Sequence, residues 1–129
     1  MKKLLCLTLV TVAVSACNKE ITTDDLVSTL RNSGVEINDV KDIKADEFAM
    51  KSFKERLAFS IPEVAPKGGQ AFICEEKKYC DAIYAYFDGL KSLAGPYLYQ
   101  SPNGKVVLQL NAKLTVETAK KLETAIAKY

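Results

Sequence analysis

The sequence predicts a single α+β domain, in which an antiparallel sheet of about 4–5 strands carries helices packed mainly on one face. Two observations support this class. Short β-rich segments follow one another across tight turns, which favours antiparallel pairing, and amphipathic segments stand before, between and after them. The expected order is α-β-α-β-β-α-β-β-α, and the domain is expected to span residues 23–129.

The N-terminal half is expected to hold a helix, a short strand, a polar loop and a second helix, at residues 23–33, 35–37, 39–42 and 45–57. Thr22 or Thr23 can cap the first helix, acids follow in its first turn, and Gly34 stands just past its end. The second helix is indicated by apolar residues on one stripe, with charged residues on the opposite side.

Two strands are expected at residues 58–61 and 70–74, on either side of a turn-rich loop at 63–69. Pro62 ends the first strand, because proline cannot donate a ladder hydrogen bond. A third helix is expected over residues 77–93, where a Gly-Pro pair follows. Its apolar face consists of Cys80, Ile83, Tyr84, Phe87 and Leu90.

A hairpin is expected from residues 97–100 and 105–110. Its turn at 101–104 reads Ser-Pro-Asn-Gly, which puts proline and glycine where a turn favours them. Thr115 then caps a last helix, with an acidic residue in the first turn. The buried face of that helix is expected to consist of Val116, Ala119, Leu122 and Ile126.

The first residues have the order of a secretory signal: two lysines, an apolar run over residues 4–14, and small residues before Cys17. The run is about 11 residues long, whereas a membrane span needs roughly 20. With a cysteine at its end, the segment resembles the lipobox of bacterial lipoproteins. An ordinary signal peptide with an A-x-A-like cleavage site is the alternative that the small residues leave open.

The lipobox resemblance implies that residues 1–16 are removed and that Cys17 carries the lipid. Residues 17–22 would then be the lipid anchor and a short linker. Asn18 follows the cysteine, which by resemblance to enterobacterial sorting favours the periplasmic face of the outer membrane in a Gram-negative host.

Cysteine usage predicts one disulfide. Of the four cysteines, Cys6 leaves with the leader and Cys17 takes the lipid, so that Cys74 and Cys80 remain. An even pair in an exported domain is typical of an oxidising compartment. A redox-active pair and a metal site are the alternatives, but the first usually reads Cys-x-x-Cys and the second needs more ligands. No metal and no cofactor are expected.

Charge and composition exclude several classes of function. The chain has 18 basic and 16 acidic residues, and loss of Lys2 and Lys3 leaves a formally neutral mature protein. This removes the basic footprint of a nucleic-acid binder. The absence of histidine excludes Ser-His-Asp and Cys-His catalysis. Adjacent acids at 24–25, 46–47 and 75–76 all fall at expected helix starts, where they stabilise the helix dipole.

Tyrosines are concentrated between residues 79 and 99. They would either bury their rings in the core with the hydroxyl in water, or form a patch for a protein or glycan partner, since tyrosine is enriched at interfaces. The candidates for such a patch are Tyr79, Tyr86, Tyr97 and Tyr99.

Three segments resemble the pattern of a family of small, mostly uncharacterised bacterial lipoproteins: GGQAFI at 68–73, YAYF at 84–87 and VVLQLN at 106–111. A terminal helix at 119–126 completes the pattern, which covers roughly half of the mature chain. The resemblance implies an envelope protein and carries over no catalytic residue. Cys74 and Cys80 depart from the pattern.

These observations favour a membrane-anchored envelope lipoprotein with a non-catalytic binding or structural domain, and an envelope protein or glycan as partner. The alternative is a phage superinfection-exclusion, conjugative exclusion or immunity lipoprotein. A third hypothesis is a carboxylate-based glycan hydrolase, which would need two acids that converge across a cleft.

Overall fold

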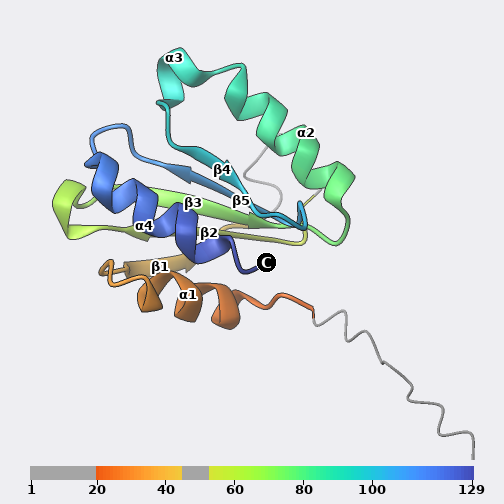
Figure 1. Ribbon diagram of the computed structural model, residues 1–129, viewed down its shortest axis with the longest axis horizontal. Helices are drawn as coiled ribbons and strands as arrows, with labels where there is room; N and C mark the ends of the chain where they lie inside the picture. The colour runs from red at the N-terminus through yellow and green to blue at the C-terminus, as the bar shows by residue number, and fades with distance from the viewer. Residues whose placement is uncertain (1–19, 45–52) are drawn as a thin grey trace, which may run out of the picture.

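The computed structural model describes residues 20–44 and 53–129 (Figure 1). Over these ranges the chain forms one five-stranded sheet in the order β1-β2-β3-β5-β4, and every neighbouring pair is antiparallel. The predicted α+β class is confirmed. The strands are Asn38–Asp42 (β1), Glu55–Ser60 (β2), Gly68–Ile73 (β3), Leu98–Gln100 (β4) and Val106–Leu110 (β5). The helices are Thr23–Asn32 (α1), Lys77–Asp88 (α2), Lys91–Ala94 (α3) and Val116–Ile126 (α4), with a 3-10 turn at Pro62–Val64 (η2).

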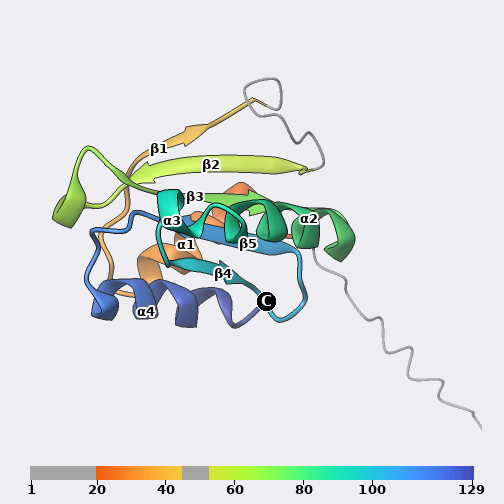
Figure 2. The same ribbon diagram turned by 90° about the horizontal axis from the view of Figure 1, so that it is seen from above.

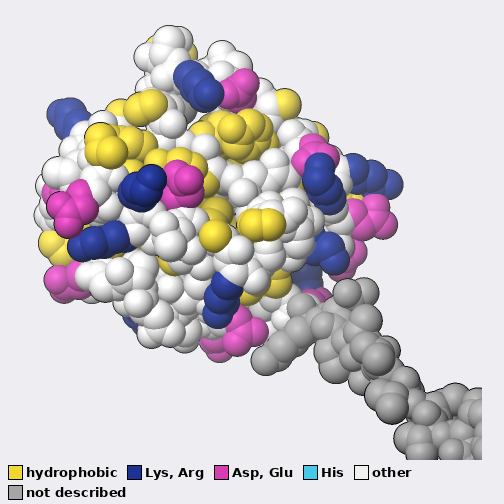
Figure 3. All heavy atoms as spheres, in the orientation of Figure 1, with side chains coloured by type: hydrophobic (Ala, Val, Ile, Leu, Met, Phe, Trp, Pro, Cys, Tyr) yellow, Lys and Arg dark blue, Asp and Glu magenta, His cyan; other side chains and the backbone are white. Residues whose placement is uncertain are grey.

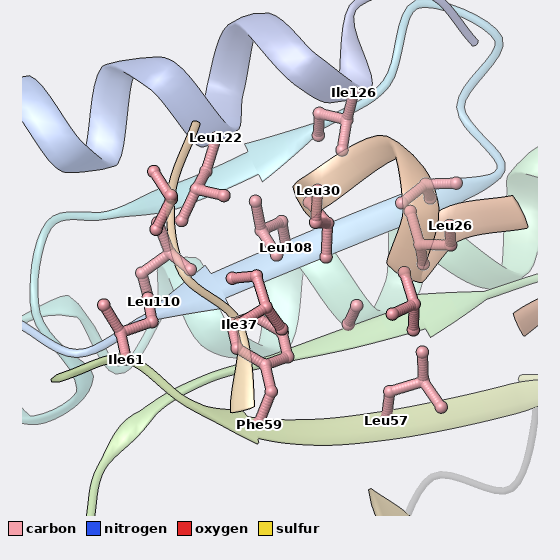
Figure 4. Packing of buried hydrophobic residues seen from close by; sticks show 14 of the residues in the cluster. Leu26, Leu30, Ile37, Leu57, Phe59, Ile61, Leu108, Leu110, Leu122 and Ile126 are labelled. Atoms are coloured by element: carbon pink, nitrogen blue, oxygen red, sulfur yellow. The ribbon is translucent and has the colours of Figure 1, made fainter. Parts of the chain in front are cut away.

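The first core cluster lies between the sheet and the helices α1 and α4. Leu26 and Leu30 of α1, and Leu122 and Ile126 of α4, point toward Leu108 on strand β5 (Figure 4). All five side chains are essentially inaccessible to water. Helices α1 and α4 thus cover one face of the sheet, but the expectation that helices lie mainly on one face is too narrow, because α2 packs on the other.

The second core cluster lies on the opposite face, under α2. Strand register explains the division, because alternate residues of a strand point to opposite faces. Ala71 pairs with Leu108 on the α1/α4 face, and the adjacent pair of Phe72 and Val107 lies under Cys80 of α2. Helices α2 and α3 thus add a layer on this second face (Figures 1 and 2).

The first correction concerns β1. A strand was expected at 35–37 and a loop at 39–42, but the strand is Asn38–Asp42. Val35 and Ile37 are buried against the first core cluster from the connection that precedes the strand. β1 is the sheet edge and pairs only with β2. Charged residues suit an edge strand, because they discourage pairing with other chains.

The second correction concerns the helix expected at 45–57. Residues 45–52 lie outside the described residues, but 55–57 belong to strand β2, which pairs with β3 over its whole length. Phe53 and Leu57 are four apart, as on one helix face, yet they belong to different core clusters. Cross-strand packing therefore overrides the local pattern.

The C-terminal half follows the prediction more closely. The hairpin and the last helix are confirmed, and the Thr115 hydroxyl accepts a hydrogen bond from the Thr118 amide at 3.2 Å. The third helix is shorter than expected, because it ends at Asp88 and only the short α3 follows. Val116 is 71% exposed, so its expected burial is wrong.

Two further features fix the sheet. Strand β3 begins at Gly68, where a Cβ atom would lie 2.4 Å from the Phe59 carbonyl oxygen, so that only glycine fits. Across β2, β3 and β5, the Arg56 guanidinium donates to Gln70 Oε1 at 2.6 Å, and the Gln70 amide donates to Gln109 Oε1 at 3.0 Å. In the described ranges, no helix has the length and apolarity to cross a bilayer.

The carboxylate of Glu63, within the 3-10 turn η2, joins this turn to the start of α4. It accepts hydrogen bonds from the Thr115 amide at 2.5 Å and the Thr118 hydroxyl at 2.7 Å. These bonds, that from Thr118 first, lower the pKa of Glu63, because they favour the charged form. The stabilisation is thus present above the ordinary pKa of 4.5 and is lost as the pH falls through the lower folded-state value.

We therefore expect Glu63→Gln to be less stable than the unmodified protein at neutral pH, and the difference to shrink below pH 4.5. Urea unfolding of both proteins at the two pH values measures it. Glu117→Gln is the matched control, since Glu117 is an exposed acid in the first turn of α4, the helix that Glu63 contacts. A stability difference that does not change with pH would contradict the role of the charge.

Candidate functional site

Several elements converge at one end of the domain, which we call the Glu20 end. One cavity there is lined by Glu20 before α1, Cys74 after β3, Asn103 in the β4–β5 turn and Tyr129, and Lys77 of α2 contacts Gly104 of the same turn. Figures 1 and 2 show the elements that meet at this end. The β4–β5 hairpin and the helices α1, α2 and α4 are joined here by side-chain contacts and hydrogen bonds, so this is a built surface and not a set of loose loops.

Tyr129 joins two of these elements to α4. Its hydroxyl shares a hydrogen bond of 2.8 Å with the Thr29 hydroxyl of α1, and its carbonyl accepts from the Asn103 amide at 3.0 Å. Gly104 at the hairpin tip has a positive φ and lies under the Lys77 side chain, where a Cβ would meet Lys77 Cγ at 2.3 Å. Any other residue at the tip would be strained by this backbone conformation and would have to displace the Lys77 side chain.

A cavity of about 710 Å³ opens at the Glu20 end. This volume is within the range of small-molecule sites, roughly 300–1,000 Å³. Its charged lining consists of Lys54, Lys105 and Lys128, and of Glu20, Asp25 and Glu75. Lys54 forms an ion pair with Glu20. The remaining two lysines and two carboxylates give the cavity both signs of charge in equal number.

A second groove of about 660 Å³ runs between α1 and α4. It shares Thr29, Asn32 and Lys128 with the cavity, so the two hollows adjoin. The face seen in Figure 3 carries basic and acidic side chains interspersed, without a field of one sign. That distribution agrees with the balanced charge of the sequence.

Cys74 and Cys80 form the predicted disulfide, with Cα atoms 5.8 Å apart. It joins the end of β3 to the first turns of α2, and both cysteines are buried in the second core cluster. The bond therefore fixes the helix start beside the cavity, of which Cys74 is part of the lining. Burial suits a structural bond better than a redox-active one, which must be reached by another thiol.

We expect the double variant Cys74→Ala, Cys80→Ala to lose roughly 2–3 kcal/mol of stability, because the unfolded chain is no longer constrained. Urea unfolding with and without dithiothreitol measures this. The reductant should destabilise the unmodified protein and leave the double variant unchanged. Two free thiols in the native, unreduced protein would contradict the disulfide.

The four candidate tyrosines do not form one surface. Tyr79 and Tyr86 lie on α2 and are 36% and 43% exposed. Tyr97 and Tyr99 are half-buried against the first core cluster, on the other face of the sheet. The Tyr97 hydroxyl donates to the Leu114 carbonyl at 3.1 Å.

Burial raises the pKa of the Tyr99 hydroxyl, with smaller contributions from the nearby Glu123 and Tyr97. Tyr99 is thus held against the core and not presented to solvent as a whole ring. Tyr79 and Tyr86 remain as exposed aromatic side chains, and whether they contact a partner stays a prediction.

The expected positions of the acidic pairs hold where the structure describes them. Asp24 and Asp25 lie in the first turn of α1, and Glu76 is the cap residue of α2. The pair at 46–47 lies outside the described residues. Among the described residues, no three Cys, Asp or Glu side chains are grouped so as to hold a metal ion.

One further acid, Asp81 of α2, was not singled out by the sequence. Hydrogen bonds from Lys77, at 2.8 Å and 3.0 Å, and from the Gln100 amide at 2.7 Å lower the pKa of its carboxyl. These bonds tie α2 to strand β4 beside the hairpin tip. Their place suggests a structural role, because the network is complete without a ligand.

The cavity itself was missed at the sequence level. Lys105, Lys128 and Glu75 come from a strand connection, the end of α4 and the loop before α2, and only the fold brings them together. No family model, curated protein or solved structure matches this chain.

Proposed function

We propose that this chain is a lipid-anchored protein of the bacterial cell envelope whose α+β domain acts by binding another envelope component. The observation that carries the proposal is Cys17, preceded by a basic start, an apolar run and small residues. By resemblance to the lipobox, acylation of this cysteine would hold the protein on a bilayer, at the periplasmic face of the outer membrane in a Gram-negative host.

The structure supports this proposal in two respects. The disulfide between Cys74 and Cys80 suits an oxidising compartment outside the cytoplasm. The first helix begins at Thr23, so only a short linker separates the folded domain from Cys17. A domain held this close to a membrane can reach other components of the same envelope layer.

A binding role is favoured over catalysis by residue chemistry. The sequence has no histidine, and its acidic pairs lie at helix starts where the dipole accounts for them. Tyr79 and Tyr86 are the exposed aromatic side chains of α2 and offer contact area for a protein or glycan.

The test is to isolate the native protein from membranes of its own cells. Mass spectrometry of the N-terminal peptide should show an acylated Cys17 as the first residue. Crosslinking of the same material should capture one dominant envelope partner, and Tyr79→Ala with Tyr86→Ala should reduce its yield. Val116→Ala, an exposed apolar residue of α4, is the matched control. An unmodified Cys17 would overturn the anchor. If the tyrosine variant and the control yield the same amount of crosslinked partner, the tyrosine surface is overturned.

A further inference from the structure

We propose that the cavity at the Glu20 end binds the headgroup of a zwitterionic aminophospholipid at the surface of the membrane that anchors the protein. The inference rests on the proposed function for the position of the bilayer. The ligand chemistry comes from the cavity itself, which combines amine and carboxylate side chains.

Tether length places the cavity at the headgroups. Glu20 lines the cavity and follows Cys17 by three residues. Because an extended chain covers at most about 3.5 Å per residue, Glu20 lies within about 10 Å of the acylated cysteine. The headgroup layer on each side of a bilayer is itself roughly 5–7 Å thick. The side of the cavity that Glu20 lines is therefore held close to the headgroup layer.

The charges of the cavity favour a ligand that carries both signs. The pairing of Lys54 with Glu20 leaves Lys105 and Lys128 for an anion. In the described parts of the chain, no hydrogen bond or ion pair joins the Lys105 side chain to another residue, and the Lys128 ammonium lies 5.2 Å from the Tyr129 ring centroid. A lysine ammonium is a point charge well suited to phosphate.

The carboxylates of Asp25 and Glu75 line the same cavity. Within the described ranges, neither carboxylate accepts a hydrogen bond from another side chain or forms an ion pair. They would repel a purely anionic headgroup and would attract the ammonium group of an ethanolamine ester. A ligand that carries both a phosphate and an ammonium thus suits a cavity lined by two lysines and two acids.

The position of the hairpin tip supports a preformed site. Asn103 is bonded to Tyr129, Gly104 packs under Lys77, and Tyr129 is bonded to Thr29. Lys105 therefore follows a hairpin tip that is held in place, and Lys128 precedes Tyr129, which is hydrogen-bonded to α1 and to the hairpin. Preformed sites lose less entropy on binding than loops that must first become ordered.

The experiment titrates the purified, acylated protein in nonionic detergent with glycerophosphoethanolamine, and follows binding by NMR chemical shifts. Lys105→Glu with Lys128→Glu should weaken binding by at least about tenfold, the usual effect of losing a charge-assisted hydrogen bond. Lys67→Glu with Lys113→Glu is the matched control, because both lysines are exposed, lie outside the cavity and change the net charge equally. The control should bind as the unmodified protein does.

Two further arms identify the ligand. Inorganic phosphate should bind more weakly than the amine ester, and equal binding would overturn the zwitterionic assignment. Photoactivatable phosphatidylethanolamine in a bilayer should label peptides that contain Lys105 or Lys128. Binding of the soluble ester without such labelling would identify a free phosphoester and overturn the lipid source.

The same samples separate this inference from the function on which it rests. Mass spectrometry reports acylation of Cys17 independently of headgroup binding. An acylated protein that binds none of the probes would overturn the headgroup site and leave the anchor intact. A protein that lacks the lipid and still binds the soluble ester would overturn the anchor and retain the zwitterionic cavity.

Discussion

Replacing Cys17 with alanine is expected to abolish acylation and to move the protein from the membrane fraction to the supernatant. The Cys17 sulfur is the atom to which lipobox chemistry would attach diacylglycerol, and alanine has no such atom. Each buried methylene contributes about 0.8 kcal/mol to membrane binding, and several chains together hold a protein far more firmly than one. No excess of basic residues would replace that loss, since the sequence from residue 17 onward has equal numbers of basic and acidic residues.

The measurement is metabolic labelling with a fatty-acid analogue, followed by fractionation of the cells. Cys6→Ala is the matched control, because Cys6 lies within the segment that the proposed lipobox processing would remove. The control should label and sediment as the unmodified protein does. A Cys17→Ala protein that is still acylated and membrane-bound would end the lipoprotein interpretation.

The parts of the fold that were predicted correctly are those with local signals. Thr22 or Thr23 was predicted to cap the first helix and Thr115 the last. Thr22 and Thr115 each accept the amide hydrogen bond of a cap. The hairpin turn at 101–104 was predicted from its Pro and Gly, and strands β4 and β5 flank it. Such signals need only the residue and its immediate neighbours, so they survive without knowledge of tertiary structure.

The elements that were predicted wrongly depend on contacts with residues far away in the sequence. Residues 55–57 form a strand because β3 lies beside them, and Leu57 pairs with Ala71. A spacing of four between Phe53 and Leu57 fits a helix, yet the same residues serve two faces of a sheet. Likewise β1 contains few apolar residues, because an edge strand needs little burial. Neither the strand at 55–57 nor the edge strand β1 can be predicted without knowing how the strands of the sheet pair.

The candidate site divides in the same way. The disulfide was predictable, because the number of cysteines and the signal-like start of the chain are read from the sequence without the fold. Tyr97 and Tyr99 pack against one core cluster, which two residues at a spacing of two can do along a strand. The cavity was not predictable, because Asp25 and Lys128 lie about a hundred positions apart and meet only through the packing of α1 and α4.

The second large effect is expected at Phe72, the centre of the core cluster under α2. Its ring is fully buried, 5.5 Å from the Phe53 ring centroid and 5.7 Å from that of Phe87. The Arg56 guanidinium lies over the same ring at 5.4 Å. Phe72→Ala removes these contacts together and leaves a cavity beside the disulfide, so we expect a loss of about 3–5 kcal/mol.

Urea unfolding followed by far-UV circular dichroism measures the loss, and Phe72→Leu is the conservative comparison. Leucine fills much of the same volume, so its cost should be smaller, roughly 1–2 kcal/mol. Phe72→Ala should lose more stability than Phe72→Leu, because a ring at the centre of a packed cluster is sensitive to the volume of its replacement. Equal and small losses would mean that α2 does not depend on Phe72. The helix would then be held on the sheet chiefly by the Cys74–Cys80 bond and by the Asp81–Gln100 hydrogen bond.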